Sequence, residues 1–413
     1  MLPAKQSGAA QKKGSHPFCI DENMKNYRIL CSLFLSVVFS NLFLSCASDA
    51  ESENEVNLSV SPRNIIALYP PNSLGDNSYY DDISYTLHVF ARENNALMAD
   101  IVPADSKEAE ENLKTALETV IPGAENLILC ADSLYLSFLE KYDLTPLAGR
   151  QILVLDAREQ ENTAISTVHL PDYGVSMLAG SVAKSLSSYF GTDVKCLCML
   201  ANETNPNFLD GMKGFIQGFG ADWNGKIYDV WDPFFDSLLG SGELEKYIKE
   251  SSFITMKLDD VPDDGAWTGL NANLRIYDNL FSLQDPQTAY GFNFYYPLCG
   301  SSVRGIGLCA QDCSQKSPFL FAGVNVKNSV YSEYIPFYVV KHIDKVVALC
   351  LSQWVSDKKI PHYQEFGLET GFTELVINED DSKWNSKELK EAVEQGKEAA
   401  IKKEREYEAE QSQ

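Results

Sequence analysis

Polar and aromatic side chains gather in residues 72–82, which read NSLGDNSYYDD. They follow an apolar run at residues 64–70 that predicts a strand, and they precede a segment that predicts a helix from about Ser78 to Asn94. Loops at the carboxyl ends of strands in open α/β sheets are where ligands bind. Carboxyl, amide and hydroxyl groups beside aromatic rings suit a flat, polar small molecule. The sequence therefore predicts a ligand-binding loop at this position.

Motifs of catalysis do not accompany this loop. The chain has no G-x-x-x-x-G-K-[ST] phosphate loop, no H-E-x-x-H zinc motif and no G-x-S-x-G nucleophile elbow. The glycines of DGMKGFIQGFG at residues 210–220 sit within or at the end of a predicted helix, which favours close helix packing over phosphate binding. Asp81 and Asp82 are adjacent acids without a base and a nucleophile beside them. We therefore expect no enzyme activity, no catalytic residue, no metal and no cofactor.

Length, composition and charge narrow the class of protein. The chain has 413 residues, of which 45% are hydrophobic, enough for two globular lobes. Its formal net charge of −24 argues against nucleic acid as a partner, because phosphate binding needs clustered Lys and Arg. The same charge argues against adhesion to anionic lipid through a basic surface. A solvated acidic surface is the simplest explanation of the excess of Asp and Glu.

The segment at residues 24–46 has the layout of a secretion signal. Lys25 and Arg28 precede an apolar stretch at residues 29–44, which is of signal length and short for a membrane span. The ending LFLSC resembles the lipobox of bacterial lipoproteins in a loosened form, which implies lipidation at Cys46. The alternative is an uncleaved single-pass anchor, and both alternatives place the rest of the chain outside the cytoplasm.

Two flanking segments fit this assignment. Residues 1–23 do not resemble part of a signal, so we expect Met24 to be the true start and residues 24–45 to be the signal peptide. Residues 46–62 begin with small, polar and acidic side chains, a composition that predicts a flexible tether between the lipid and the folded domain.

Seven cysteines remain when Cys19, Cys31 and Cys46 are set aside, and an odd number leaves at least one thiol unpaired. No His stands at ligand spacing beside them, so we expect buried or disulfide-bonded thiols instead of a zinc site. Cys196 and Cys198 alternate along a predicted strand, so their side chains point to the same face of the sheet. The seven residues are Cys130, Cys196, Cys198, Cys299, Cys309, Cys313 and Cys350.

Continuous apolar strands alternate with helical patterns along most of the chain, which indicates parallel sheets covered on both faces. The pattern weakens between Asp232 and Ala289, where the sequence is rich in turn residues and we expect partly irregular structure. From Lys383 onward nearly all residues are Lys, Glu, Gln and Ala, which predicts a charged helical tail over residues 381–413 that is solvated and frays.

The order of several short motifs resembles the basic-membrane-protein lipoproteins, which include the purine nucleoside receptors of bacterial importers. Residues 75–81 are similar to the family's first loop, G-D-x-x-F-N-D, and the strand LILCAD ends in an aspartate as the family's does. Later matching segments, in chain order, are PDYGVSMLAGSVAKSL, FLDGMKGFIQGFG, YYPLCGS, AGVNVKN, YVVKHID and GLETGFT. The similarity runs from about Ile65 to Leu375.

This resemblance implies the α/β fold of the type I periplasmic-binding proteins, in which two doubly wound lobes joined by a three-strand hinge close on a ligand. It implies that residues 63–168 and 293–342 form the first lobe. Residues 169–292 and 343–380 are then expected to form the second lobe.

The resemblance also assigns ligand contacts in the first half of the chain. Asp76 and Asn77 match polar contacts of the family's first loop, and Tyr79 stands where the family has Phe. Asp132 matches an acid that reads the edge of the base. Without the resemblance, an aspartate such as Asp76 in a strand–helix loop is more often a helix cap than a ligand.

Further contacts are implied in the second half. Tyr296 matches a Phe that stacks on the base, with Gly300 and Ser301 beside it. Asn325 replaces an Asp that holds the ribose hydroxyls, and Lys341 matches a lysine at the sugar end. Considered alone, Tyr296 on an apolar strand is more often a core residue, and Lys341 is more often a surface lysine.

The resemblance implies a lipid-anchored extracytoplasmic protein that captures a nucleoside-like solute for an importer made of membrane permease and ATPase subunits. A ligand that bridges two lobes favours their closed arrangement, so no covalent chemistry is required. The alternative is a ligand-sensing or scaffold lipoprotein with the same fold and no role in transport.

Overall fold

In the computed structural model, the described residues all lie within Val60–Gln413. The predicted signal at residues 24–45, Cys46, almost all of the 46–62 tether and most of residues 232–289 lie outside the described residues. No helix in the described ranges is long and apolar enough to cross a bilayer. These ranges are 62–75, 79–119, 121–144, 150–201, 205–221, 223, 225–229, 251–257, 276–278, 280–281, 291–299, 303–325 and 329–411.

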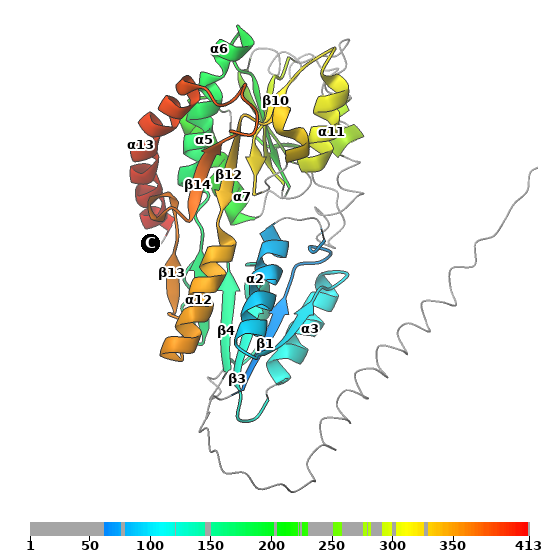
Figure 1. Cartoon of the computed structure of the whole chain (residues 1–413), viewed down its shortest axis with the longest axis vertical. Coiled ribbons are helices and arrows are strands. Elements are labelled where there is room, and N and C mark those ends of the chain that lie inside the picture. Colours follow the sequence, from blue (N-terminus) through cyan, green and yellow to red (C-terminus); the bar gives the residue numbers. More distant parts are fainter. Residues whose placement is uncertain are drawn as a thin grey trace, which may run out of the picture. The chain divides into compact units, whose positions relative to one another are not determined.

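A parallel six-stranded sheet forms the first lobe, with strand order β13-β5-β4-β3-β1-β2 (Figure 1). Its central strands are buried along almost their whole length because helices cover both faces, which explains their uninterrupted apolar sequences. The strands are β1 (Arg63–Leu68), β2 (Leu97–Ile101), β3 (Glu125–Cys130), β4 (Arg150–Leu155), β5 (Ile165–His169) and β13 (Tyr363–Glu365), and the helices are α2 (Tyr79–Glu93), α3 (Ser106–Glu118), α4 (Tyr135–Leu139) and α12 (Ile343–Asp357).

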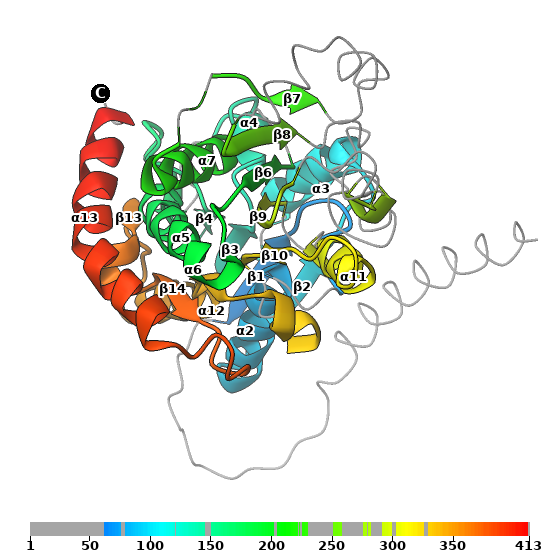
Figure 2. The same ribbon diagram turned by 90° about the horizontal axis from the view of Figure 1, so that it is seen from above.

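The second lobe has a parallel sheet of order β10-β9-β6-β8-β7 (Figure 2). It also has a smaller sheet of order β11-β12-β14, in which β14 runs antiparallel to β12. Its strands are β6 (Cys196–Leu200), β7 (Tyr228–Asp229), β8 (Phe253–Lys257), β9 (Phe294–Leu298), β10 (Leu320–Phe321), β11 (Gly323–Val324), β12 (Phe337–Lys341) and β14 (Thr373–Ile377). Its helices are α5 (Tyr173–Ser185), α6 (Ser187–Phe190), α7 (Pro206–Phe219), α11 (Val303–Cys313) and α13 (Lys387–Gln411), with short η2 (Ser329–Tyr334) and η3 (Leu368–Thr370).

The prediction of which segments build each lobe was wrong for the later part of the chain. Strand β9 pairs with β6, so residues 293–342 continue the second lobe and do not complete the first. Helix α12 buries its apolar face against α2, and β13 pairs with β5, so residues 343–365 return to the first lobe. The β14 segment then pairs with β12 in the second lobe.

The chain therefore passes between the lobes at three places, which confirms the predicted three-strand hinge. The first crossing joins β5 to α5, the second joins β12 to α12, and the third joins β13 to η3. Because the crossings lie far apart in sequence, only the folded structure brings their polar groups together.

Local sequence fixes the ends of α7. The Asn205 side chain accepts hydrogen bonds from the backbone N–H groups of Asn207 and Phe208, and Pro206 occupies the first helical position. The helix ends at Gly220, whose φ of 67° is a left-handed conformation that glycine adopts readily. These residues also explain why the FLDGMKGFIQGFG segment forms one helix without a phosphate loop.

Helices α5 and α7 pack closely along small residues, as the glycine pattern predicted. A Cβ atom added to Gly218 would lie 1.8 Å from the carbonyl oxygen of Met177 on α5, a distance that no real contact allows. This close approach fixes α5, whose first turn begins immediately after the first crossing of the hinge.

The described cysteines are all buried and free. Cys196 and Cys198 face the same core cluster of the second lobe, as their alternation predicted. The sulfur atoms of Cys309 and Cys313 lie 3.8 Å apart on α11 without a bond between them. The structure thus supports the buried-thiol alternative for these residues.

We predict that Gly218→Ala destabilises the protein by about 3 kcal/mol or more, because α5 and α7 must separate to admit a methyl group. Gly123→Ala is the control: its φ is 79°, but an added Cβ meets nothing within 4 Å, so we expect a loss of about 1 kcal/mol. Equilibrium unfolding in urea measures both free energies. Equal losses in the two variants would contradict close helix packing at Gly218.

Candidate functional site

Polar side chains of the first lobe meet where its central strands end. Tyr79 begins α2 after the loop that follows β1, Asp132 follows β3, and Asp156 follows β4. These three strands are neighbours in the parallel sheet, so their carboxyl ends lie at one edge. Tyr80 donates a 2.7 Å hydrogen bond to one carboxylate oxygen of Asp132, and the backbone N–H of Leu134 donates to the other at 2.8 Å.

Lys341 joins this edge to the hinge. Its side chain is 2% exposed, and its Nζ donates 2.8 Å hydrogen bonds to Oδ2 of Asp156 and to Oδ2 of Asp172. Burial alone would lower the pKa of this lysine, but the two carboxylates raise it above its ordinary value. Lys341 ends β12 and Asp172 precedes α5, so this ion-pair cluster links two hinge crossings to the end of β4.

Burial shapes the protonation of the acids in this cluster. It raises the pKa of Asp172 to about 6, against the opposing effect of Lys341. It also raises the pKa of Asp132, although Leu134 N–H and the Tyr80 hydroxyl act in the opposite direction. The hydroxyl of Tyr79 has a raised pKa because it is buried and because Asp156, Asp132 and Asp172 lie near it. These groups therefore form one electrostatically connected set.

The buried polar atoms without a hydrogen-bond partner in the described residues include the Tyr79 hydroxyl, Oδ1 of Asp156 and Oδ1 of Asn325. Asn325 follows β11, and its backbone N–H bonds to Val339 on β12, two residues before Lys341. Asp156 and Asn325 both have φ of 54°, a left-handed conformation that short polar residues tolerate best. Unpaired buried polar atoms beside strained backbone are typical of positions that bind a ligand.

We call the set Tyr79, Asp132, Asp156, Asp172, Asn325 and Lys341 the hinge-edge site. Tyr79, Asp132, Asn325 and Lys341 were predicted from the resemblance, and the buried environment of Lys341 excludes the surface-lysine alternative. Sequence reasoning missed Asp156 and Asp172. Each follows an apolar strand directly or within a few residues, in VLDA and HLPDYG, and that placement is the signal that could have found them.

Four predicted site residues cannot be placed. Asp76 and Asn77 of the first loop, and Gly300 and Ser301 after β9, lie outside the described residues. Their ligand contacts stay predictions. The loop remains adjacent in sequence to Tyr79, and β9 belongs to the second lobe.

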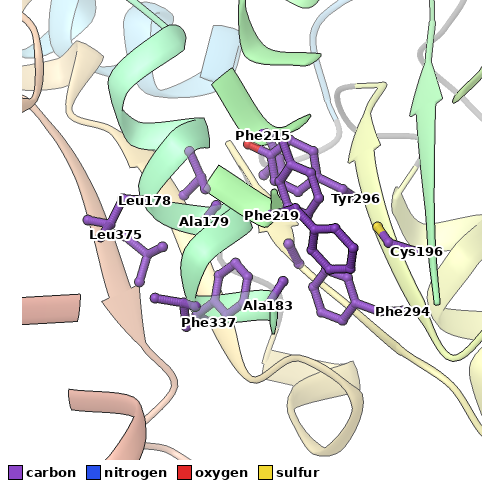
Figure 3. Close-up of a cluster of buried hydrophobic side chains, with 14 of the residues drawn as sticks. Leu178, Ala179, Ala183, Cys196, Phe215, Phe219, Phe294, Tyr296, Phe337 and Leu375 are labelled. Atoms are coloured by element: carbon purple, nitrogen blue, oxygen red, sulfur yellow. The ribbon is translucent and has the colours of Figure 1, made fainter. Parts of the chain in front are cut away.

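The prediction that Tyr296 stacks on a ligand is wrong in this structure. Tyr296 is fully buried in the core of the second lobe, where its ring stacks on Phe215 with centroids 4.0 Å apart (Figure 3). Its hydroxyl donates a 2.7 Å hydrogen bond to Ser176 on α5. Strand β9 lies between β6 and β10 inside the sheet, and helices cover both faces of that sheet. Both faces of β9 therefore carry core residues. The alternative that Tyr296 is a core residue is confirmed.

The expectation of a solvated tail was also wrong. Helix α13 lies along α5 and buries Leu389, Ala400, Glu404 and Glu408 (Figure 1). The carboxylate of Glu404 accepts hydrogen bonds from the backbone N–H of Gly174 at 3.1 Å and of Leu368 at 2.8 Å. Gly174 and Leu368 lie in the first turns of α5 and η3, directly after the first and third crossings, so one side chain of α13 holds the second-lobe ends of two crossings together.

A second carboxylate of α13 reaches the first lobe. Arg158, in the segment after β4, donates to Glu408 and also forms a 2.7 Å ion pair with Asp210 on α7. The Tyr407 hydroxyl donates to the same Asp210, and its ring stacks on Tyr173 at 4.0 Å. Arg158 thus connects the first lobe to two helices of the second.

Comparison with known proteins identifies the fold. No family model matches the chain, and no curated protein matches its sequence. Among solved structures, a solute-binding protein of an ABC transporter system from Aeropyrum pernix K1 has a TM-score of 0.60 at 15% identity, covering 83% of this chain and 92% of that chain. An ABC transporter periplasmic solute-binding protein from Actinobacillus succinogenes 130z with bound D-allose has a TM-score of 0.51 at 11% identity, covering 77% of this chain and 98% of that chain.

A transcriptional activator of the comK gene from Bacillus halodurans is also similar, with a TM-score of 0.51, 14% identity, and coverage of 82% of this chain and 97% of that chain. At these identities the likeness shows the fold alone. The chain therefore has the type I periplasmic-binding-protein fold, as predicted. Membership of the basic-membrane-protein family stays a prediction.

We predict that Lys341→Met lowers the free energy of unfolding by roughly 3–5 kcal/mol, because it leaves Asp156 and Asp172 without their buried cation. Lys397→Met on the exposed face of α13 is the control, with an expected change within about 0.5 kcal/mol. Denaturant titration at pH 7 compares the two variants. A Lys341→Met loss no larger than that of the control would show that the ion-pair cluster does not stabilise the hinge.

Glu404 predicts a pH dependence of stability. Burial raises its pKa from 4.5 to about 8, although the N–H groups of Leu368 and Gly174 lower it and the nearby Glu408 and Glu365 raise it. The folded state then holds a proton that the unfolded state has lost. The stability that this proton provides is fully present below about pH 4.5 and is lost as the pH rises through 8.

We therefore expect the wild type to lose stability relative to Glu404→Gln as the pH rises from 5 to 8, by roughly 1.4 kcal/mol per pH unit at most. Unfolding free energies measured across that range test this slope. Glu398→Gln, an exposed substitution on the same helix, should keep a constant difference from the wild type. If the difference in unfolding free energy between the wild type and Glu404→Gln is also constant, then the carboxyl of Glu404 is ionised in the folded protein over this whole pH range.

Proposed function

We propose that this chain is an extracytoplasmic solute-binding protein that captures a small polar molecule at the hinge-edge site. The observation that carries the proposal is the group of buried polar atoms without partners on Tyr79, Asp156 and Asn325, at the strand ends where ligands bind in open α/β sheets. Leaving such atoms unpaired costs about 1–3 kcal/mol each, so a solute that pairs them gains affinity. The fold supports the same role, because solved solute-binding proteins share it.

We propose further that the solute is nucleoside-like, that Cys46 carries a lipid anchor, and that permease and ATPase subunits of an importer receive the solute. The nucleoside rests on the resemblance of the motif order to purine nucleoside receptors, since Asp132 can accept from ring N–H groups. The anchor rests on the signal-like segment that precedes Cys46. Asp76, Asn77, Gly300 and Ser301 are the additional contacts that this proposal expects.

The residues of the hinge-edge site come from both lobes, so a bound solute favours closure of the two lobes. Tyr79, Asp132 and Asp156 come from the first lobe, whereas Asn325 comes from the second. A solute that bonds to both groups favours the arrangement in which they are close, and this differential affinity is what shifts the equilibrium between open and closed forms.

Tyr79→Phe tests the site without disturbing the fold, because it removes a hydroxyl that has no partner in the structure. We predict that the variant is at least as stable as the wild type and binds inosine or guanosine about 5–10 times more weakly, which corresponds to one lost hydrogen bond. Isothermal titration calorimetry measures the affinity, and thermal unfolding checks the fold. Tyr85→Phe is the matched control, since Tyr85 lies on the same helix and is 73% exposed.

Two results would count against the proposal in different ways. If the wild type binds D-allose or D-arabinose and no nucleoside, the nucleoside assignment is wrong while the solute-binding role stands. If Tyr79→Phe binds its solute as tightly as the Tyr85→Phe control, the solute does not occupy the hinge-edge site.

A further inference from the structure

The charged groups of the hinge-edge site are predominantly acidic. Asp132, Asp156 and Asp172 carry three carboxyl groups around the single ammonium of Lys341. Burial favours protonation of Asp132, but even then two carboxylates remain around one ammonium. The described part of the site therefore has an excess of negative charge in both protonation states.

The cations near this cluster already have acidic partners. Lys341 uses two of its three N–H donors on Asp156 and Asp172. Arg158 is bound by Asp210 and Glu408. The charge of Lys341 and of Arg158 is already balanced by two carboxylates each, so an anionic solute gains little net attraction from these residues.

The buried atoms without a hydrogen-bond partner also favour a solute that brings donor groups and no negative charge. Oδ1 of Asp156 and Oδ1 of Asn325 are acceptors, and the Tyr79 hydroxyl can donate or accept. Acceptors need O–H or N–H groups from the solute, whereas phosphate and carboxylate oxygens would face them with like partial charge. The exclusion of water strengthens these interactions relative to a surface site.

From these observations we propose that the site selects uncharged or cationic solutes that bring hydrogen-bond donors, and that it rejects the phosphorylated and carboxylated forms of the same solutes. This inference rests on the proposed function and deepens it by naming the charge class of the substrate. The chain's net charge of −24 adds a long-range field that slows the approach of anions and speeds that of cations.

Matched pairs that differ by one phosphate test the inference. The probes are guanosine with guanosine 5′-monophosphate and D-allose with D-allose 6-phosphate, titrated calorimetrically into the intact protein at 0.15 M ionic strength. For any pair that binds, we expect the Kd of the uncharged member to be at least about 100-fold lower than that of the phosphorylated member, because like charges brought together at a site cost several kcal/mol.

A variant makes the origin of this selectivity testable. Asp156→Asn removes the negative charge that pairs with Lys341, and it should narrow the ratio of the two affinities about tenfold, in line with a charge a few ångströms away in a medium of intermediate dielectric. Asp193→Asn, an exposed aspartate in the loop before β6, should leave the ratio unchanged. The ratio between two probes is insensitive to a general loss of active protein.

The outcomes separate the inference from the function on which it rests. Equal or tighter binding of the phosphorylated member would overturn the charge selectivity and leave the solute-binding role intact. The same affinity ratio in Asp156→Asn and Asp193→Asn would show that the Asp156 carboxylate does not set the selectivity. If neither member of either pair binds and a broad metabolite panel also gives no response, the proposed function fails and the inference fails with it.

Discussion

The buried ammonium of Lys341 connects three segments of the chain at the hinge. Lys341 lies between Asp156 and Asp172, so that the end of β4, the first crossing and the second crossing meet in one ion-pair cluster. A buried charge is tolerated only when its partners are in place, which makes the three segments interdependent. The same cluster leaves one oxygen of Asp156 without a partner, so the constraint that organises the hinge also creates an acceptor for a solute.

Helix α13 constrains the hinge from another direction. Glu404 bonds to backbone N–H groups at the starts of α5 and η3, where the chain enters the second lobe, while Glu408 and Asp210 hold Arg158 of the first lobe. A change in the angle between the lobes would move or break the Arg158 ion pairs and leave the Glu404 bonds inside the second lobe.

The sequence predicted the fold class because it depends on patterns that repeat along the chain, namely buried parallel strands alternating with helices. It did not predict which segments return to which lobe, since strand order depends on pairings such as β9 with β6. The family resemblance assigned Tyr296 to the ligand, whereas its position on an apolar strand alone favoured the core, where the structure places it. Sequence reasoning missed Glu404 and Glu408 because buried carboxylates in a charged helix are recognisable only through partners remote in sequence.

The crystal structure of the protein with a solute bound tests the central claim most directly. The account predicts that donor groups of the solute lie within hydrogen-bond distance of Oδ1 of Asp156 and Oδ1 of Asn325, with the Tyr79 hydroxyl also engaged and the Lys341 ion pairs intact. A solute bound elsewhere, with these three atoms contacting only water, would contradict the account.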